Sequence, residues 1–115
     1  MLGHSLGGIT ITQVAEQLPN KIECLVYLAA FLLKDGQSRM NTVGDLKGSV
    51  LELYIQRVPQ EGYSTVREEG LKPSFYHDCS EEDIKWAKSK LVPQALQPLA
   101  TPVKTSDNNF GKVRR

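Results

Sequence analysis

The sequence predicts an α/β fold, and three observations in chain order support this. A G-x-S-x-G motif stands at Gly3–Gly7. A helical pattern of apolar residues begins directly after it, and a nearly continuous apolar run follows that helix. A tight turn, a helix and a buried strand in this order are typical of part of a parallel sheet.

The predicted helix extends from Ile9 to Leu18. Four of its apolar residues have the i, i+3, i+4, i+7 spacing of one helical face: Ile11, Val14, Ala15 and Leu18. Pro19 and Asn20 predict its end. The apolar run from Cys24 to Phe31 is too short to span a bilayer, which needs about 20 residues. We expect a strand buried on both faces, and we assign residues 1–36 to a core fragment.

Residues 37–103 are predicted to form a mainly helical lid that adds no strand to the main sheet. Ser49–Val58 carries a short helical pattern, whereas Tyr63–Val66 has the composition of a short strand. The clearest helix of this region is expected between residues 80 and 91, because Ser80 and Asp83 have capping-box spacing. Residues 104–115 are expected to return toward the next core strand.

Composition and charge exclude several classes of protein. The chain has 115 residues, of which 40% are hydrophobic and 23% charged, as in soluble globular domains. Its net charge of +1 provides no strong field for nucleic acid or a membrane surface. Cys24 and Cys79 form neither a disulfide framework nor a zinc site, so we expect no metal. No signal peptide is recognisable, and we expect a cytoplasmic protein.

The motif at Gly3–Gly7 indicates a nucleophile. A serine at a tight turn from strand to helix adopts a strained conformation, and its hydroxyl projects above the sheet. Ser5 is therefore the predicted nucleophile, and the backbone N–H of Leu6 is the predicted oxyanion donor. We expect that only glycine leaves room at positions 3 and 7. A glycine-rich turn that merely opens a helix is the alternative; phosphate-binding motifs are absent.

Neither histidine of the chain is expected to be the catalytic base. His4 adjoins Ser5, but neighbouring side chains across a tight turn diverge. His77 stands next to Asp78, whereas the order in this type of site is serine, then acid, then histidine. We interpret His4 as a local packing or hydrogen-bonding residue and His77 as a surface or pocket-rim residue.

Several separate blocks of the sequence resemble one known family. The blocks are Gly3–Gly8, Val26–Phe31, Tyr76–Asp83, Leu91–Pro93 and Phe110–Arg115. In this order they resemble the methylesterase and hydroxynitrile lyase branch of the α/β-hydrolases, from the nucleophile elbow through the lid. The resemblance implies part of an α/β-hydrolase fold. It also implies a cofactor-free serine hydrolase that acts on a small apolar ester, and it is compatible with a homodimer of the full-length parent.

The resemblance also implies roles for individual residues. Phe31 and Leu6 would line the substrate pocket, and Trp86 would approach it, although ordinary core packing is the alternative for Phe31 and Trp86. The lyases of this group carry Glu and Cys beside the serine; His4 and Leu6 here resemble the esterases. The acid and the histidine of the triad lie beyond the lid in the family and are absent from this chain. We therefore expect a truncated, inactive fragment of an ester hydrolase, with a non-catalytic remnant or a carbon–carbon lyase as alternatives.

Overall fold

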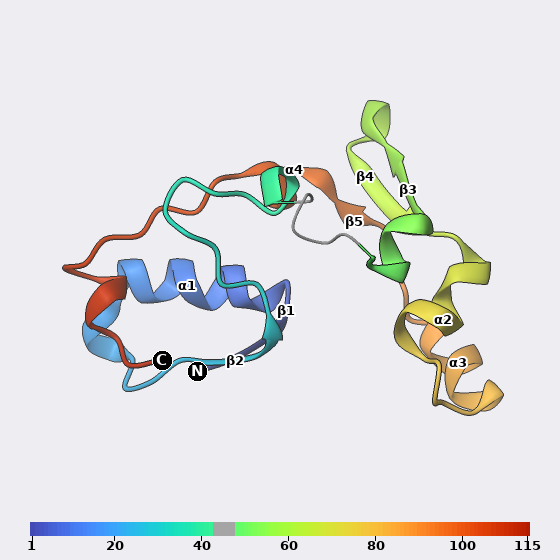
Figure 1. The fold of residues 1–115 in the computed structure, drawn as a ribbon, viewed down its shortest axis with the longest axis horizontal. Helices are drawn as coiled ribbons and strands as arrows, with labels where there is room; N and C mark the ends of the chain where they lie inside the picture. Colours follow the sequence, from blue (N-terminus) through green and yellow to red (C-terminus); the bar gives the residue numbers. More distant parts are fainter. Residues whose placement is uncertain (43–47) are drawn as a thin grey trace. The chain divides into compact units, whose positions relative to one another are not determined.

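The computed structural model describes residues 1–42 and 48–115 (Figure 1). The chain divides into two compact units, which are described separately. The first unit comprises Met1–Thr42 together with Ala100–Arg115, and the second comprises Val43–Leu99. The first unit is thus built from both ends of the chain.

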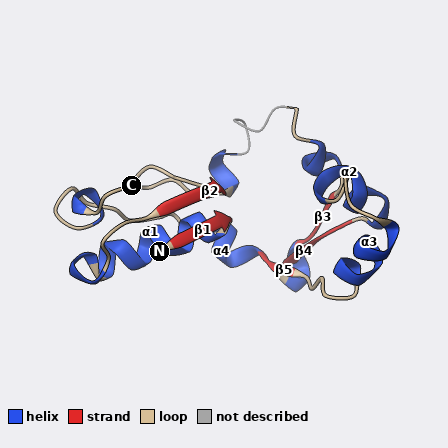
Figure 2. Cartoon of the chain, turned by 90° about the horizontal axis from the view of Figure 1, so that it is seen from below, coloured by secondary structure: helices blue, strands red, loops and turns tan. Residues whose placement is uncertain are grey.

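The sheet of the first unit consists of two parallel strands, β1 (Leu2–Ser5) and β2 (Val26–Ala30) (Figure 2). In the register of this pair, Leu2 lies opposite Val26 and His4 opposite Leu28. A single parallel bridge joins Cys24 to Arg114, and the Leu25 N–H donates to the Arg114 carbonyl at 2.8 Å. The last residues of the chain therefore run parallel to the approach to β2.

Helix α1 (Gly7–Gln17) connects the two strands and buries its apolar face. Ile11 and Ala15 pack into the core with three residues from outside the helix: Leu25, Phe110 and Val113. The buried Thr12 hydroxyl donates to the Gly8 carbonyl at 2.8 Å and lies 2.6 Å from the Tyr27 hydroxyl of β2. The predicted helix is confirmed, with observed ends one or two residues earlier than the pattern indicated. Its predicted apolar face is right for the buried Ile11 and Ala15 but wrong for Leu18, which follows the helix and is 52% exposed.

The predicted burial of the apolar strand on both faces is wrong for this chain. Successive side chains of a strand point to opposite faces. The half-buried Tyr27 reaches α1, but Val26 and Leu28 on the other face are 48% and 56% exposed. None of the described residues buries these two side chains, because α1 covers only one face of the pair.

Two polar side chains of α1 bind the segment that returns to the sheet. The Gln13 amide donates to the Lys104 carbonyl at 2.9 Å and accepts from the Lys104 N–H at 3.3 Å. The Glu16 carboxylate accepts four hydrogen bonds, from the Ser106 N–H and hydroxyl, the Asn109 amide and the Phe110 N–H. Desolvation alone would raise the pKa of Glu16, but the four hydrogen bonds outweigh it and hold the pKa below its ordinary value.

In the full-length protein, we expect Glu16→Gln to lower the urea denaturation midpoint at neutral pH and to weaken the dependence of that midpoint on pH. A carboxylate whose pKa is lowered by folding stabilises the protein above its unfolded pKa, and this contribution is lost as the pH falls through the folded pKa. The wild-type midpoint should therefore approach that of the variant in acid. Urea titrations of both proteins at neutral and acidic pH measure this, and parallel curves at all pH values would contradict it.

The second unit contains a three-stranded antiparallel sheet in the order β3 (Ile55–Val58), β4 (Tyr63–Val66) and β5 (Gln94–Ala95). The short strand expected at Tyr63–Val66 is confirmed. The helical pattern in Ser49–Val58 is only partly right, since a 3-10 turn at Val50–Leu53 gives way to β3. Ile55 lies opposite Val66 in the ladder, and this pairing replaces the helix.

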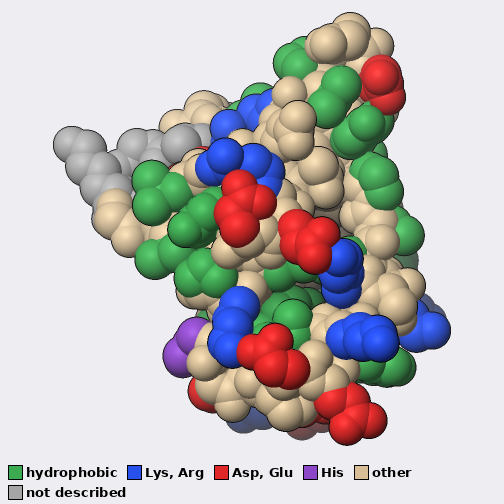
Figure 3. Space-filling model, turned by 90° about the vertical axis from the view of Figure 1, so that its right-hand side faces the viewer, with side chains coloured by type: hydrophobic (Ala, Val, Ile, Leu, Met, Phe, Trp, Pro, Cys, Tyr) green, Lys and Arg blue, Asp and Glu red, His purple; other side chains and the backbone are tan. Residues whose placement is uncertain are grey.

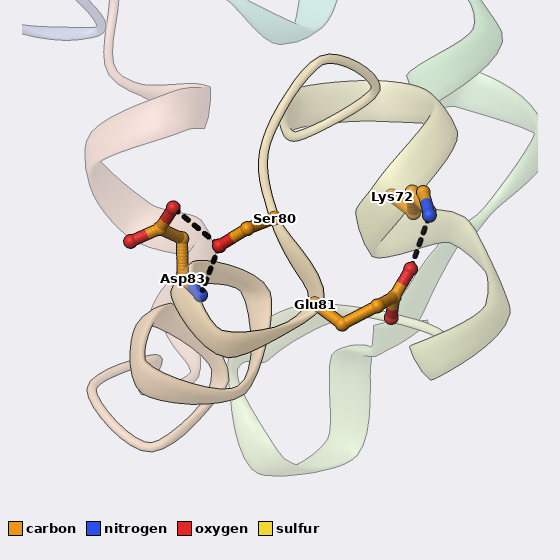
Figure 4. Close-up of polar contacts among 4 residues, drawn as sticks. All are labelled: Lys72, Ser80, Glu81 and Asp83. Carbon is orange, nitrogen blue, oxygen red and sulfur yellow. Dashed lines mark hydrogen bonds and ion pairs between the residues drawn. The ribbon is translucent and has the colours of Figure 1, made fainter.

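Three short helices accompany this sheet: α2 (Leu71–Phe75), α3 (Glu81–Lys88) and α4 (Leu96–Ala100). The predicted cap of α3 is confirmed: the Ser80 hydroxyl accepts from the Asp83 N–H at 3.1 Å and donates to its carboxylate at 2.6 Å (Figure 4). Lys72 of α2 pairs with Glu81 at the start of α3. The cap satisfies the first turn of α3, and the exposed Lys72–Glu81 pair links this turn to α2.

The surface of the second unit carries both signs of charge. Acidic and basic side chains lie side by side on the face shown in Figure 3, and Lys88 pairs with Glu68. Because the two signs of charge alternate, the described residues of this face create no extended electrostatic potential of one sign. Among the described residues, no helix is both long and apolar enough to cross a membrane.

Candidate active site

Ser5 occupies a strained turn between β1 and α1. It is the last residue of β1, and α1 begins two residues later at Gly7. Its φ is 52°, in the left-handed region that residues other than glycine rarely adopt. The side chain is exposed. The predicted position of Ser5 between a strand end and a helix, with backbone geometry unusual for a non-glycine residue, is confirmed.

The two glycines that allow this turn are Gly3 and Gly8. A Cβ atom on Gly3 would lie 2.7 Å from the Gly7 carbonyl oxygen, and one on Gly8 would lie 2.3 Å from the Phe31 carbonyl oxygen. The expectation that only glycine fits at position 7 is wrong. A Cβ at Gly7 would meet none of the described atoms outside its own helix backbone within 4 Å. The crowding arises where α1 approaches β2, one residue further along the chain.

Leu6 stands at the junction of the turn and the helix. It is half-buried, has right-handed helical geometry as the N-cap of α1, and accepts from the Ile9 N–H at 3.1 Å. In the part of the chain that the structure describes, its own N–H donates to no carbonyl or side chain. A free N–H beside a nucleophile at a helix start is the donor that an oxyanion requires. Its role in catalysis stays a prediction.

Phe31 follows β2 and its backbone contacts the elbow. Its N–H donates to the Ser5 carbonyl at 3.0 Å. Its half-buried ring lies under the guanidinium of Arg39, 5.1 Å from the ring centroid, and Arg39 is itself buried. The backbone thus brings Phe31 next to Ser5, and the role of its side chain in a substrate pocket stays a prediction. Trp86, on α3 in the other unit, is 66% exposed, and its approach to the pocket stays a prediction.

The structure gives Ser5 no catalytic partner among the described residues. Its hydroxyl makes no hydrogen bond there to a histidine or a carboxylate. His4, on β1, and His77, before α3, are both exposed. No group of three His, Cys, Asp or Glu side chains in the described ranges could hold a metal ion.

One feature of this site was missed by sequence reasoning. Ala29 of β2 has a φ of 41°, and the register shifts between His4 and Ser5, so that Ser5 lies opposite Ala30. Alanine does not favour a positive φ, and no pattern in the sequence predicts this conformation at Ala29. Only the paired strands reveal it.

Comparison with known proteins supports the resemblance over the whole chain, although no family model matches. The chain is 31% identical to salicylic acid-binding protein 2 of Nicotiana tabacum, over all of this chain and 48% of that protein. It is 27% identical to putative methylesterase 11, chloroplastic, of Arabidopsis thaliana, over all of this chain and 32% of that protein.

The same branch is found among solved structures. The crystal structure of polyneuridine aldehyde esterase superimposes with a TM-score of 0.76 at 25% identity, over 99% of this chain and 49% of that one. The chain thus spans about half the length of the tobacco protein and of this esterase. The predicted fold class, part of an α/β-hydrolase fold, is confirmed by this superposition. Sequence and fold together confirm that the chain is similar, from end to end, to the methylesterase-like branch of the α/β-hydrolases.

Proposed function

We propose that the full-length protein containing this chain is a serine hydrolase of small, partly apolar carboxylic esters, with Ser5 as its nucleophile. The backbone of Ser5 supports this most directly, because φ is 52° at the junction of β1 and α1. Strained non-glycine residues persist only where the surrounding structure enforces them, and they cluster at active sites. Two relatives named as a methylesterase and an esterase support the same reaction class.

The proposed reaction proceeds through an acyl-enzyme. The Ser5 hydroxyl oxygen attacks the carbonyl carbon of the ester while its proton passes to a base. The bond to the alcohol oxygen then breaks, the alcohol leaves with that proton, and the acyl group stays on Ser5. Water hydrolyses this intermediate and releases the carboxylic acid. The Leu6 N–H and the start of α1 stabilise the negative charge on the carbonyl oxygen.

The remaining parts of the machinery are proposed from the resemblance. By that resemblance, the acid and the histidine of the triad belong to sequence beyond the lid. Residues 37–103 act as the lid, Phe31 lines the pocket, and Trp86 approaches it from the lid. The enzyme needs no cofactor, works in the cytoplasm and has no nucleic-acid or membrane partner. A homodimer of the full-length protein is compatible with the resemblance.

A paired assay of the full-length protein tests the reaction class. We expect hydrolysis of small methyl esters, no cleavage of cyanohydrins, and labelling of Ser5 by a fluorophosphonate, located by mass spectrometry. Cleavage of cyanohydrins without ester hydrolysis would identify a lyase. The absence of both activities and of labelling would identify a non-catalytic remnant and refute the proposal.

We further propose that the 115-residue chain alone labels slowly and unfolds without cooperativity. Leu2, Val26 and Leu28 on one face of the sheet are each about half exposed or more, at 59%, 48% and 56%. An apolar sheet face and unpaired strand edges favour association. Calorimetry and labelling of the purified chain measure both properties. A monomer that melts cooperatively and labels as fast as the full-length protein would contradict this.

A further inference from the structure

Each strand of the pair at the elbow contains one strained residue. Ser5 and Ala29 are the two non-glycine residues with positive φ in the described part of the chain, at 52° and 41°. The pairing passes from His4 opposite Leu28 to Ser5 opposite Ala30, which leaves Ala29 without a partner in the register. One additional residue in one strand of a pair is a β-bulge, and such bulges occur beside active sites.

The bulge lets β2 keep contact with the chain as the chain turns into the helix. Because Ala29 is left out of the pairing, the Phe31 N–H can donate to the Ser5 carbonyl at 3.0 Å. The end of β2 also contacts the first turn of α1, because the Phe31 carbonyl and the Ala30 side chain pack closely against Gly8. The elbow is therefore held at the strand end through Ser5 and at the helix start through Gly8.

We propose that the bulge at Ala29 is a positioning device for the nucleophile. It sets the register that fixes the Ser5 carbonyl and the start of α1, and thereby fixes the Ser5 hydroxyl relative to the Leu6 N–H. Ala29 touches no reacting atom, so it is a positioning residue. This inference rests on the ester hydrolysis proposed above and adds a residue outside the motif to that site.

Substitutions that differ in their tolerance of positive φ test the proposal in the full-length protein. Ala29→Val introduces a β-branched side chain that resists this conformation, whereas Ala29→Gly accepts it freely. Ala29 is exposed in this chain, so the valine methyl groups crowd none of the core described here. We expect Ala29→Val to lower kcat and the rate of fluorophosphonate labelling by a factor on the order of 10 to 100, with a smaller change in KM. Ala29→Gly should keep the wild-type rates.

Leu28→Val is the matched control, because it places the same side chain one residue earlier, at an exposed position whose φ is not positive. It should leave labelling unchanged. Should Ala29→Val fail to fold, Ala29→Thr and Ala29→Asn take its place, since asparagine tolerates the left-handed region and threonine does not. Their labelling is corrected for the folded fraction measured by circular dichroism.

The outcomes separate this inference from the function beneath it. If the wild type labels and Ala29→Val or Ala29→Thr labels equally fast, the bulge is merely structural and the inference is wrong. If the β-branched variants lose stability but not labelling rate, the same conclusion holds. If the wild-type protein neither labels nor hydrolyses esters, the proposed function fails first, and the positioning role falls with it.

Discussion

Ser5→Ala in the full-length protein should abolish ester hydrolysis, with kcat falling by a factor on the order of 10⁴ to 10⁶. The variant removes the atom that forms the acyl bond, and the partial oxyanion site at Leu6 can supply only residual rate enhancement. The turn itself should survive, because alanine and serine pay similar strain at a φ of 52°. Steady-state kinetics with a methyl ester and fluorophosphonate labelling measure the loss.

Ser106→Ala provides the matched control. It also removes a serine hydroxyl from the first unit, where that hydroxyl donates to Glu16 at 2.8 Å, but it has no part in the proposed chemistry. We expect it to lower stability slightly and to leave kcat unchanged. A Ser5→Ala protein that keeps more than a small fraction of the wild-type kcat would show that Ser5 is not the nucleophile.

Gly8→Ala should destabilise the full-length protein by about 1–3 kcal/mol, the usual cost of inserting a methyl group into filled space. The added Cβ would lie 2.3 Å from the Phe31 carbonyl oxygen, and this backbone atom cannot swing away as a side-chain end could. To remove this steric clash, α1 must move away from β2, and this movement also disturbs the elbow. Urea denaturation and labelling of Ser5 should therefore both report the change.

Gly7→Ala is the neighbouring comparison and should behave oppositely. A Cβ at Gly7 meets none of the described atoms within 4 Å, and the φ of Gly7 is not positive. In the middle of a helix alanine is favoured over glycine by about 0.5–1 kcal/mol. Gly7 is the first residue of α1, so the gain is smaller there and this variant should be close to neutral. Equal losses of stability for both variants would refute the assignment of the crowding to Gly8.

The elements around Ser5 were predictable because their signals are local. A serine between glycines, an apolar face at helical spacing and an apolar run each act within a few residues, and the elbow, α1 and β2 follow them. The failures arose where pairing or packing with another segment decides the outcome. Residues 55–58 became a strand because β4 pairs with them, although their own spacing indicated a helix. The crowding at Gly8 instead of Gly7 depends on Phe31, whose approach to α1 no motif describes.

The contacts of Gln13 and Glu16 with the returning segment have a consequence for the order of folding. They join residues 90 to 94 positions apart in sequence, and the second unit lies within the intervening loop. Closing a long loop costs entropy that must be lost before its contacts can form. During synthesis on the ribosome, Gln13 and Glu16 of α1 therefore cannot form these hydrogen bonds until Lys104–Phe110 has emerged. Nascent chains arrested before that segment should stay sensitive to protease around α1, and chains arrested well after it should become resistant.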